Sequence, residues 1–230
     1  MTEWWTYRPS DLLMFAPRTY WRLFELHNEA WWPLQPLAVL AGLGWLAWLW
    51  QRGSPAPQGG AAVLRAGAAA LAIASAFVGG LFLWQRYAPI NWAAPALASG
   101  FFAQGLGLAV LATRGDLHRA LSALRVRIGA LLVGWALLGQ PLLAPAFGRP
   151  WTQAEVFALA PDPTAVATLG VLLSCGAERA LTRALLRLLW VLTVLQCTIS
   201  AATLLTMGLP QGWVPLGAAL LAVVAALARR

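Results

Sequence analysis

Long blocks of uncharged, mostly apolar residues run through this chain and decide what it can fold into. The blocks are residues 31–50, 66–84, 93–113, 128–147, 163–176, 188–207 and about 209–228. A helix that crosses a bilayer needs about 20 such residues. Only 10% of the 230 residues are charged and 60% are hydrophobic, whereas roughly a quarter of the residues of a soluble domain are charged.

These blocks predict an all-α fold, a polytopic membrane bundle of about seven transmembrane helices. Residues 31–230 would form the bundle and residues 1–30 a separate N-terminal interfacial segment. Block 163–176 is the exception, because at about 1.5 Å per residue it spans only about 21 Å. We expect it to extend upstream through Val156 or to be re-entrant, so the form of 156–176 stays open. No signal peptide is expected before the first block, since a basic start and a cleavage site are missing.

The arginines predict how the chain is oriented in the membrane. All 16 basic residues are arginines, and eleven fall in one set of loops and five in the other. The richer set holds Arg52, Arg65, Arg114, Arg119, Arg125, Arg127, Arg179, Arg183, Arg187, Arg229 and Arg230. Such loops face the cytoplasm. We therefore expect a multi-pass protein of a bacterial inner membrane, with a periplasmic N-terminus, a cytoplasmic C-terminus, the lipid bilayer as its partner and no nucleic acid.

The segment that begins at Pro17 has the pattern of an amphipathic helix. Its apolar positions are Tyr20, Leu23, Phe24, His27 and Trp31, and its charged positions are Arg18, Arg22, Glu25 and Glu29. Aromatic residues favour the depth of the lipid headgroups, so this helix is expected to lie on the outer interface. The alternative is a lid over an outward-facing cavity, with Glu25 and Glu29 at its mouth.

Two stretches carry a resemblance to a known family. They are YRPSDLLMFAPRTYWRLFELHNEAWWP at 7–33 and PAFGRPWTQAEVFALAPDPTAVATLG at 145–170. Both resemble an uncharacterised family of bacterial multi-span inner-membrane proteins that is catalogued as a domain of unknown function. The resemblance implies a membrane bundle along the full chain and carries no established activity.

A pair of similar segments suggests an internal repeat. Segment 36–44 and segment 163–170 both read Pro-x-Ala-Val followed by glycine, and 89–95 and 210–215 both read Pro-x-x-Trp followed by proline. Spans one to three and five to seven would then form a 3+1+3 parallel repeat, an arrangement known in small transporters. The alternative is that proline and tryptophan simply mark the ends of spans.

Polar residues near or within the blocks are the candidate ligand-binding groups. Asp162 lies between two prolines, where it or Thr164 can cap a helix, or where it can face a cavity and bind a cation or a polar solute. Tryptophans around the mouth of such a cavity could add cation–π contacts, and the interior glutamines could bond between helices or line a solute path. The full set is Glu25, Glu29, Trp32, Gln35, Trp92, Gln104, Gln140, Asp162, Thr164, Gln196 and Trp213.

Three classes of function are compatible with this pattern. The first is a permease or channel for a small neutral or cationic solute, which predicts a cavity lined by Gln104, Gln140 or Gln196. The second is a non-transporting subunit, scaffold or sensor with a sealed core, bound to a membrane protein or to its own copies. The third, a membrane enzyme, needs Asp162, His27 and a glutamate within hydrogen-bond reach.

No catalytic residue, metal site or cofactor is predicted. The predicted spans hold no deep ionisable side chain, which argues against a proton pump with a buried carboxylate. Retinal would need a lysine, and the chain has none. Its two cysteines do not make a zinc site, and its two histidines are expected on opposite sides of the membrane, where they cannot hold haem together.

Overall fold

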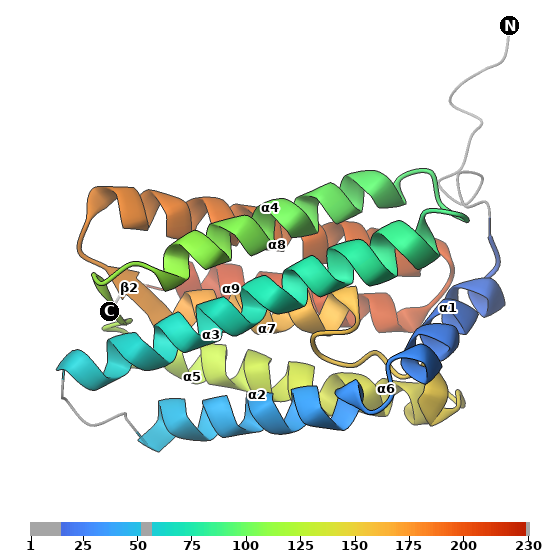
Figure 1. The fold of residues 1–230 in the computed structure, drawn as a ribbon, viewed down its shortest axis with the longest axis horizontal. Helices are drawn as coiled ribbons and strands as arrows, with labels where there is room; N and C mark the ends of the chain where they lie inside the picture. Colours follow the sequence, from blue (N-terminus) through green and yellow to red (C-terminus); the bar gives the residue numbers. More distant parts are fainter. Residues whose placement is uncertain (1–14, 52–56, 229–230) are drawn as a thin grey trace, which may run out of the picture.

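The computed structural model describes residues 15–51 and 57–228, and nearly all of their regular structure is helical (Figure 1). The α-helices are α1 (Pro17–Ala30), α2 (Leu34–Gln51), α3 (Pro57–Phe77), α4 (Ala94–Ala112), α5 (Ala123–Gly134), α6 (Gln140–Ala146), α7 (Pro161–Ser174), α8 (Ala180–Thr206) and α9 (Trp213–Leu227). Helix α3 continues as the π-helical segment η3 (Val78–Tyr87), and η4 (Trp135–Gly139), also π-helical, joins α5 to α6. Short 3-10 turns are η5 (Trp151–Gln153) and η6 (Pro210–Gly212). The all-α prediction is confirmed.

Within the described residues, five helical stretches are long and apolar enough to cross a membrane. They are Gly60–Tyr87, Ala94–Ala112, Ala123–Ala146, Ala180–Thr206 and Pro210–Leu227. Helices α1 and α2 also pass this test together, but the chain bends by 85° between them. Figure 1 shows the long helices side by side along one axis, with α1 across one end. The structure is therefore compatible with a membrane protein, while the prediction of seven spans is not confirmed.

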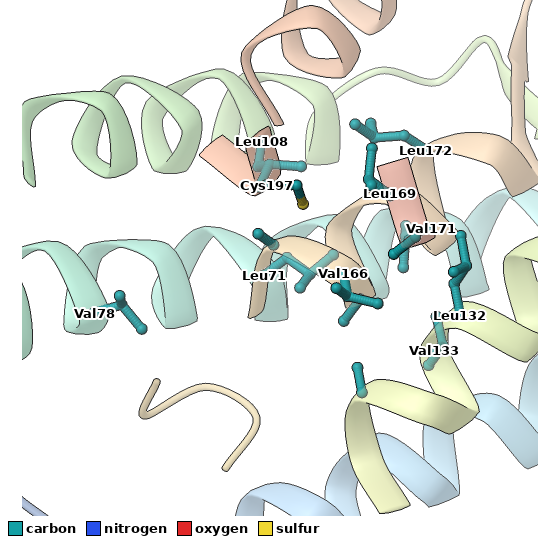
Figure 2. Close-up of a cluster of buried hydrophobic side chains, with 14 of the residues drawn as sticks. Leu71, Val78, Leu108, Leu132, Val133, Val166, Leu169, Val171, Leu172 and Cys197 are labelled. Atoms are coloured by element: carbon teal, nitrogen blue, oxygen red, sulfur yellow. The ribbon is translucent and has the colours of Figure 1, made fainter. Parts of the chain in front are cut away.

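Helix α7 is the centre of the bundle. Every residue from Asp162 to Ser174 is buried, as expected for a helix that is enclosed by its neighbours on all sides. Figure 2 shows the cluster of buried side chains around it. The labelled members of that cluster are Leu71, Val78, Leu108, Leu132, Val133, Val166, Leu169, Val171, Leu172 and Cys197.

The expected upstream extension of α7 through Val156 is wrong. The helix begins at Pro161, in the first turn, where proline loses no helical hydrogen bond. The preceding loop satisfies its backbone locally, because the Ala160 N–H donates to the Val156 carbonyl at 2.9 Å. The Ala158 N–H donates to the Thr164 hydroxyl at 3.1 Å. The chain therefore enters the bundle as an ordered loop and becomes helical only at its centre.

Two glycines bring α5 and α7 into backbone contact. A Cβ atom placed on Gly129 would lie 2.5 Å from the Gly170 carbonyl oxygen, and one on Gly170 would lie 2.5 Å from the Gly129 carbonyl oxygen. No real Cβ atom fits at that distance. The C-terminal half of α7 is therefore held tightly against α5.

A short antiparallel pair of strands joins two connections at the end of the bundle that holds the described end of α9. Strand β1 (Leu117–Arg119) pairs with β2 (Cys175–Ala177), with Leu117 opposite Ala177. Asp116 accepts hydrogen bonds from the Arg179 N–H at 2.9 Å and the Thr182 hydroxyl at 3.0 Å. Desolvation raises the pKa of Asp116, but these bonds outweigh it and the pKa is lowered. Helix α1 lies at the opposite end (Figure 1).

Candidate functional site

A small pocket lies beneath α1, at the start of α7. It has a volume of about 40 Å³. Its lining comes from α1, η3, α4, α7 and α8: Tyr20, Phe82, Leu83, Tyr87, Leu97, Phe101, Pro161, Asp162, Ala165, Gln196, Ile199, Ser200 and Thr203. Because one water needs about 10–15 Å³ measured in this way, the pocket has room for only a few waters or a ligand of a few heavy atoms.

Asp162 is the charged group of this pocket. It is 3% exposed, and one carboxylate oxygen, Oδ1, accepts a hydrogen bond from the Ser200 hydroxyl of α8. The other oxygen, Oδ2, is buried and has no donor among the described residues. The carboxylate makes no capping bond to the start of α7, so the capping interpretation of Asp162 is wrong. Proline residues on both sides of it fix the helix start without a side-chain cap.

Gln196 supplies a second unpartnered polar group to the same lining. Both polar atoms of its carboxamide are buried without a hydrogen-bond partner within residues 15–51 and 57–228. Gln196 and Ser200 are four residues apart on α8, so they share one face of that helix. An unpaired carboxylate oxygen and an unpaired carboxamide in an apolar pocket are costly unless a ligand or water bonds to them.

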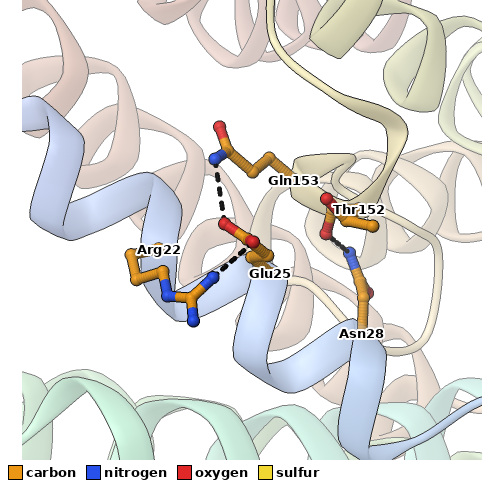
Figure 3. Close-up of polar contacts among 5 residues, drawn as sticks. All are labelled: Arg22, Glu25, Asn28, Thr152 and Gln153. Atoms are coloured by element: carbon orange, nitrogen blue, oxygen red, sulfur yellow. Dashed lines mark hydrogen bonds and ion pairs between the residues drawn. The ribbon is translucent and has the colours of Figure 1, made fainter.

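Helix α1 contributes Tyr20 to the pocket lining and is held in place by polar contacts to the η5 region (Figure 3). The Asn28 amide donates to the Thr152 and Ala154 carbonyls, each at 2.8 Å. The Gln153 amide donates to Glu25 at 3.1 Å, and Glu25 also forms an ion pair with Arg22. The buried face of α1 is aromatic, and its Tyr20 is part of the pocket lining. The predicted helix from Pro17 is confirmed. Glu25 and Glu29, which the lid alternative expects at the mouth of a cavity, are not part of this lining.

A second buried carboxyl group, that of Glu155, lies in the loop before α7. Glu155 is 1% exposed, and its Oε2 accepts a bond from the Gln140 amide at 3.4 Å, while its Oε1 has no partner among the described residues. Burial, followed by the nearby Asp162 carboxylate, raises the pKa of Glu155. Arg149 partly offsets both effects. Its guanidinium also stacks on Trp21 of α1, 3.4 Å from the ring centroid.

The three interior glutamines have different environments. Gln104 is fully buried away from the pocket, where its amide donates to Ser75 at 3.1 Å and to Thr168 at 3.4 Å. Its carbonyl oxygen accepts from Thr193 at 3.1 Å. Gln140 bonds to Glu155 and accepts from the Trp135 indole at 3.2 Å. Of the three, only Gln196 lines the pocket.

The other predicted site residues are dispersed. Thr164 holds the loop before α7, since its hydroxyl accepts from Ala158 and donates to the Ala160 carbonyl at 2.7 Å. Gln35 donates to the Asn28 carbonyl at 2.7 Å. The side chains of Glu29, Trp32, Trp92 and Trp213 are exposed and are not part of the pocket lining.

The arrangement required for an enzyme is not formed by the described residues. His27 is buried among aromatic rings, and neither of its ring nitrogens has a hydrogen-bond partner there. It therefore does not bond to Asp162 or to a glutamate. The same part of the chain contains no group of three or more His, Cys, Asp or Glu side chains that could hold a metal ion.

The sequence did not predict the aromatic and hydroxyl side chains of the site. Tyr20, Tyr87 and Ser200 all line the pocket beside Asp162. For Ser200, the four-residue spacing from Gln196 was a usable signal, because it puts two polar side chains on one helix face. For the tyrosines no local signal exists, since only the packing of α1 and η3 brings them together.

Comparison with known proteins adds a family. A model of a family of unknown function, DUF6064, matches residues 18–230. The chain belongs to this family. No curated protein and no solved structure matches it. Because residues 18–230 include all of α1 after Pro17 and every pocket residue, the DUF6064 match covers the whole candidate site. It contributes no activity, so the function must be argued from the pocket.

Proposed function

We propose that this DUF6064 member is a multi-pass integral membrane protein that binds a small cationic solute in the pocket beneath α1, as a permease or channel. One observation carries the proposal: the buried Oδ2 atom of Asp162 has no donor among the described residues, and it shares a pocket with the unpartnered Gln196. A cation with N–H groups would balance the carboxylate and bond to the carboxamide oxygen. The aromatic walls fit a cation as well.

The size of the pocket restricts the ligand. A volume of about 40 Å³ suits ammonium or methylammonium and is too small for a sugar or a nucleotide. Movement of α1 would be needed for entry from the end of the bundle. The contacts of Asn28, Glu25 and Gln153 would have to break for this movement, and they are few and exposed or only partly buried.

Thermal unfolding of the detergent-purified protein tests the binding step. Ammonium, methylammonium and tetramethylammonium would be compared with urea as a neutral solute, because a ligand that binds the folded state raises its apparent stability. We expect methylammonium or ammonium to raise Tm in the wild type and to have no effect on Asp162→Asn. Glu29→Gln is the matched control, as it removes an exposed carboxylate of the same helix that belongs neither to the pocket lining nor to the contacts that hold α1. A Tm shift that persists in Asp162→Asn would refute the site.

Uptake of the same cation into vesicles separates transport from binding. A non-transporting subunit, scaffold or sensor is the second candidate function, because the Gln104 cluster seals the core below the pocket. That cluster joins α3, α4, α7 and α8 through hydrogen bonds among Gln104, Ser75, Thr168 and Thr193. Binding without uptake would favour this candidate, with a membrane protein partner or a second copy of the chain on the outer helix faces.

We also propose seven crossings of a bacterial inner membrane, with the N-terminus periplasmic and the C-terminus cytoplasmic. The arginine distribution supports this orientation. The parallel repeat stays a prediction, in which Asp162 corresponds to Gln35. A green fluorescent protein fused to the C-terminus should fluoresce in bacterial cells. A fusion that inserts into the membrane without fluorescing would indicate the opposite orientation.

A further inference from the structure

A groove lies at the opposite end of the bundle from the pocket that contains Asp162. It has a volume of about 660 Å³ and lies between the β1–β2 pair, the start of α5, the first half of α8 and the end of α9. Three arginines contribute to its lining, Arg125, Arg183 and Arg187, together with His118 and Trp190. No aspartate or glutamate does.

The positive charge of this groove is not neutralised within the described residues. The ion pair between Arg22 and Glu25 belongs to the other end of the bundle, and no ion pair of Arg125, Arg183 or Arg187 occurs in residues 15–51 and 57–228. Arg183 donates to the backbone carbonyl of Glu178, while the Nε atom of Arg125 is buried without an acceptor. The groove therefore offers charged donors that lack an anion.

Trp190 adds a further donor of the same kind. Its indole Nε1 is buried without an acceptor in the described part of the chain, and the residue belongs to the groove lining. The unsatisfied side-chain atoms of the lining, on Arg125 and Trp190, are both N–H donors. A ligand with several acceptor oxygens and negative charge would satisfy them, and arginine is well shaped to bind phosphate oxygens in pairs.

The remaining lining is apolar and continues along the bundle surface. It includes Leu186 and Val191 on α8 and Ala226 and Leu227 on α9. Val191 is 60% exposed and Leu227 is 75% exposed. A free inorganic anion would leave this surface uncovered, whereas a molecule with a phosphate head and acyl chains would cover both parts of the groove.

We propose that this groove binds one anionic phospholipid, with its phosphate between Arg125, Arg183 and Arg187 and its acyl chains along α8 and α9. Basic pockets between membrane helices bind such headgroups on the cytoplasmic side. This site rests on the bilayer location proposed above and is independent of the cation pocket. It gives the arginine-rich end a specific lipid in addition to general attraction to the membrane surface.

Lipid titration of the delipidated protein in a non-ionic detergent tests the site. Dioleoylphosphatidylglycerol would be compared with dioleoylphosphatidylcholine, which has the same chains and no net charge, and with inorganic phosphate. We expect a saturable rise in Tm with phosphatidylglycerol alone. In the variant R125Q/R187Q, its apparent affinity should fall by about fivefold for each arginine removed. The single variant Arg187→Gln, at an exposed position, serves if the double variant does not fold.

R119Q/R127Q is the matched control, because it removes two charges from the same end of the bundle but outside the groove lining. It should keep the wild-type lipid affinity. Equal losses in the two double variants would show general surface attraction and overturn the site. A Tm rise with phosphate alone would indicate a small-anion site and would also overturn the lipid proposal. Asp162→Asn should leave the lipid response intact, so failure at one pocket is distinguishable from failure at the other.

Discussion

Both halves of α7 are buried, but they differ in whether their polar side chains have hydrogen-bond partners. In the C-terminal half, Gly170 touches the backbone of α5. The Thr168 hydroxyl accepts a hydrogen bond from the Gln104 amide and donates one to the Thr164 carbonyl. In the N-terminal half, Asp162 faces a pocket and keeps one oxygen without a donor among the described residues. The contrast indicates that the C-terminal half stabilises the bundle. The N-terminal half instead carries a buried polar group that lowers stability but can bind a ligand.

The largest effect is expected where the backbones of α5 and α7 touch. Gly170→Ala would place a methyl group 2.5 Å from the Gly129 carbonyl oxygen, so the helices must separate. Overpacking of this kind costs about 1–3 kcal/mol and more where backbone must move, so we expect a loss of about 3 kcal/mol of stability. Tm in detergent and the yield of folded protein measure it.

Gly217→Ala is the control for this substitution. Gly217 is also helical, but a Cβ atom there meets nothing within 4 Å. Because alanine favours a helix by up to about 1 kcal/mol over glycine, this variant should be as stable as the wild type or more stable. Equal Tm values for the two variants would mean that α5 and α7 do not touch.

The second prediction compares two buried glutamines. Gln104→Ala removes one partner from each of Ser75, Thr168 and Thr193 and leaves a cavity, so a loss of about 2–3 kcal/mol is expected. Gln196→Ala removes a carboxamide that has no partner in the described residues, and its effect should stay within about 1 kcal/mol. Paired Tm measurements decide it, and a larger loss for Gln196→Ala would reverse the comparison.

The third prediction concerns Asp162 in the absence of any small cation. Asp162→Asn keeps an oxygen that can accept the Ser200 bond and removes a buried charge. Since an uncompensated buried charge is costly, the variant should be unchanged or more stable by about 1 kcal/mol. Unfolding in a buffer free of ammonium and amines measures this. A clear loss of stability would make the carboxylate a structural group and would remove the basis of the binding proposal.

The sequence predicts the helical segments well, because uncharged blocks of about 20 residues have few other solutions. Six of the seven blocks overlap the long apolar stretches or α2, and α7 begins two residues before block 163–176. The sequence could not show that α7 lies at the centre of the bundle, because a short apolar block has the same composition whether lipid or protein surrounds it. The burial of every residue from Asp162 to Ser174 and the contact between Gly129 and Gly170 reveal its position.

The candidate site was less predictable than the fold. Asp162 and Gln196 stood out as polar residues in or near apolar blocks, and both line the pocket. The tryptophans stood out equally, yet Trp32, Trp92 and Trp213 are exposed. Aromatic residues at the ends of helices are favoured by the interface itself, so their presence does not distinguish a pocket from a membrane anchor. Tyr20 reaches the pocket only because α1 folds back over the bundle, with an 85° bend before α2.

The last prediction concerns the pH dependence that Glu155, in the loop before α7, gives to the stability of the protein. Burial and the Asp162 carboxylate hold its pKa above the ordinary value of about 4.5, so the folded protein binds a proton more tightly than the unfolded chain does. This contribution to stability is complete below about pH 4.5 and is lost as the pH rises through the folded pKa. Arg149 partly offsets this loss, because its guanidinium favours the ionised form. Glu155→Gln should therefore flatten the decline of Tm above pH 4.5 and leave a protein that is more stable than the wild type in alkaline buffer. If Glu155→Gln keeps the wild-type slope, Glu155 does not take up the proton and the prediction fails.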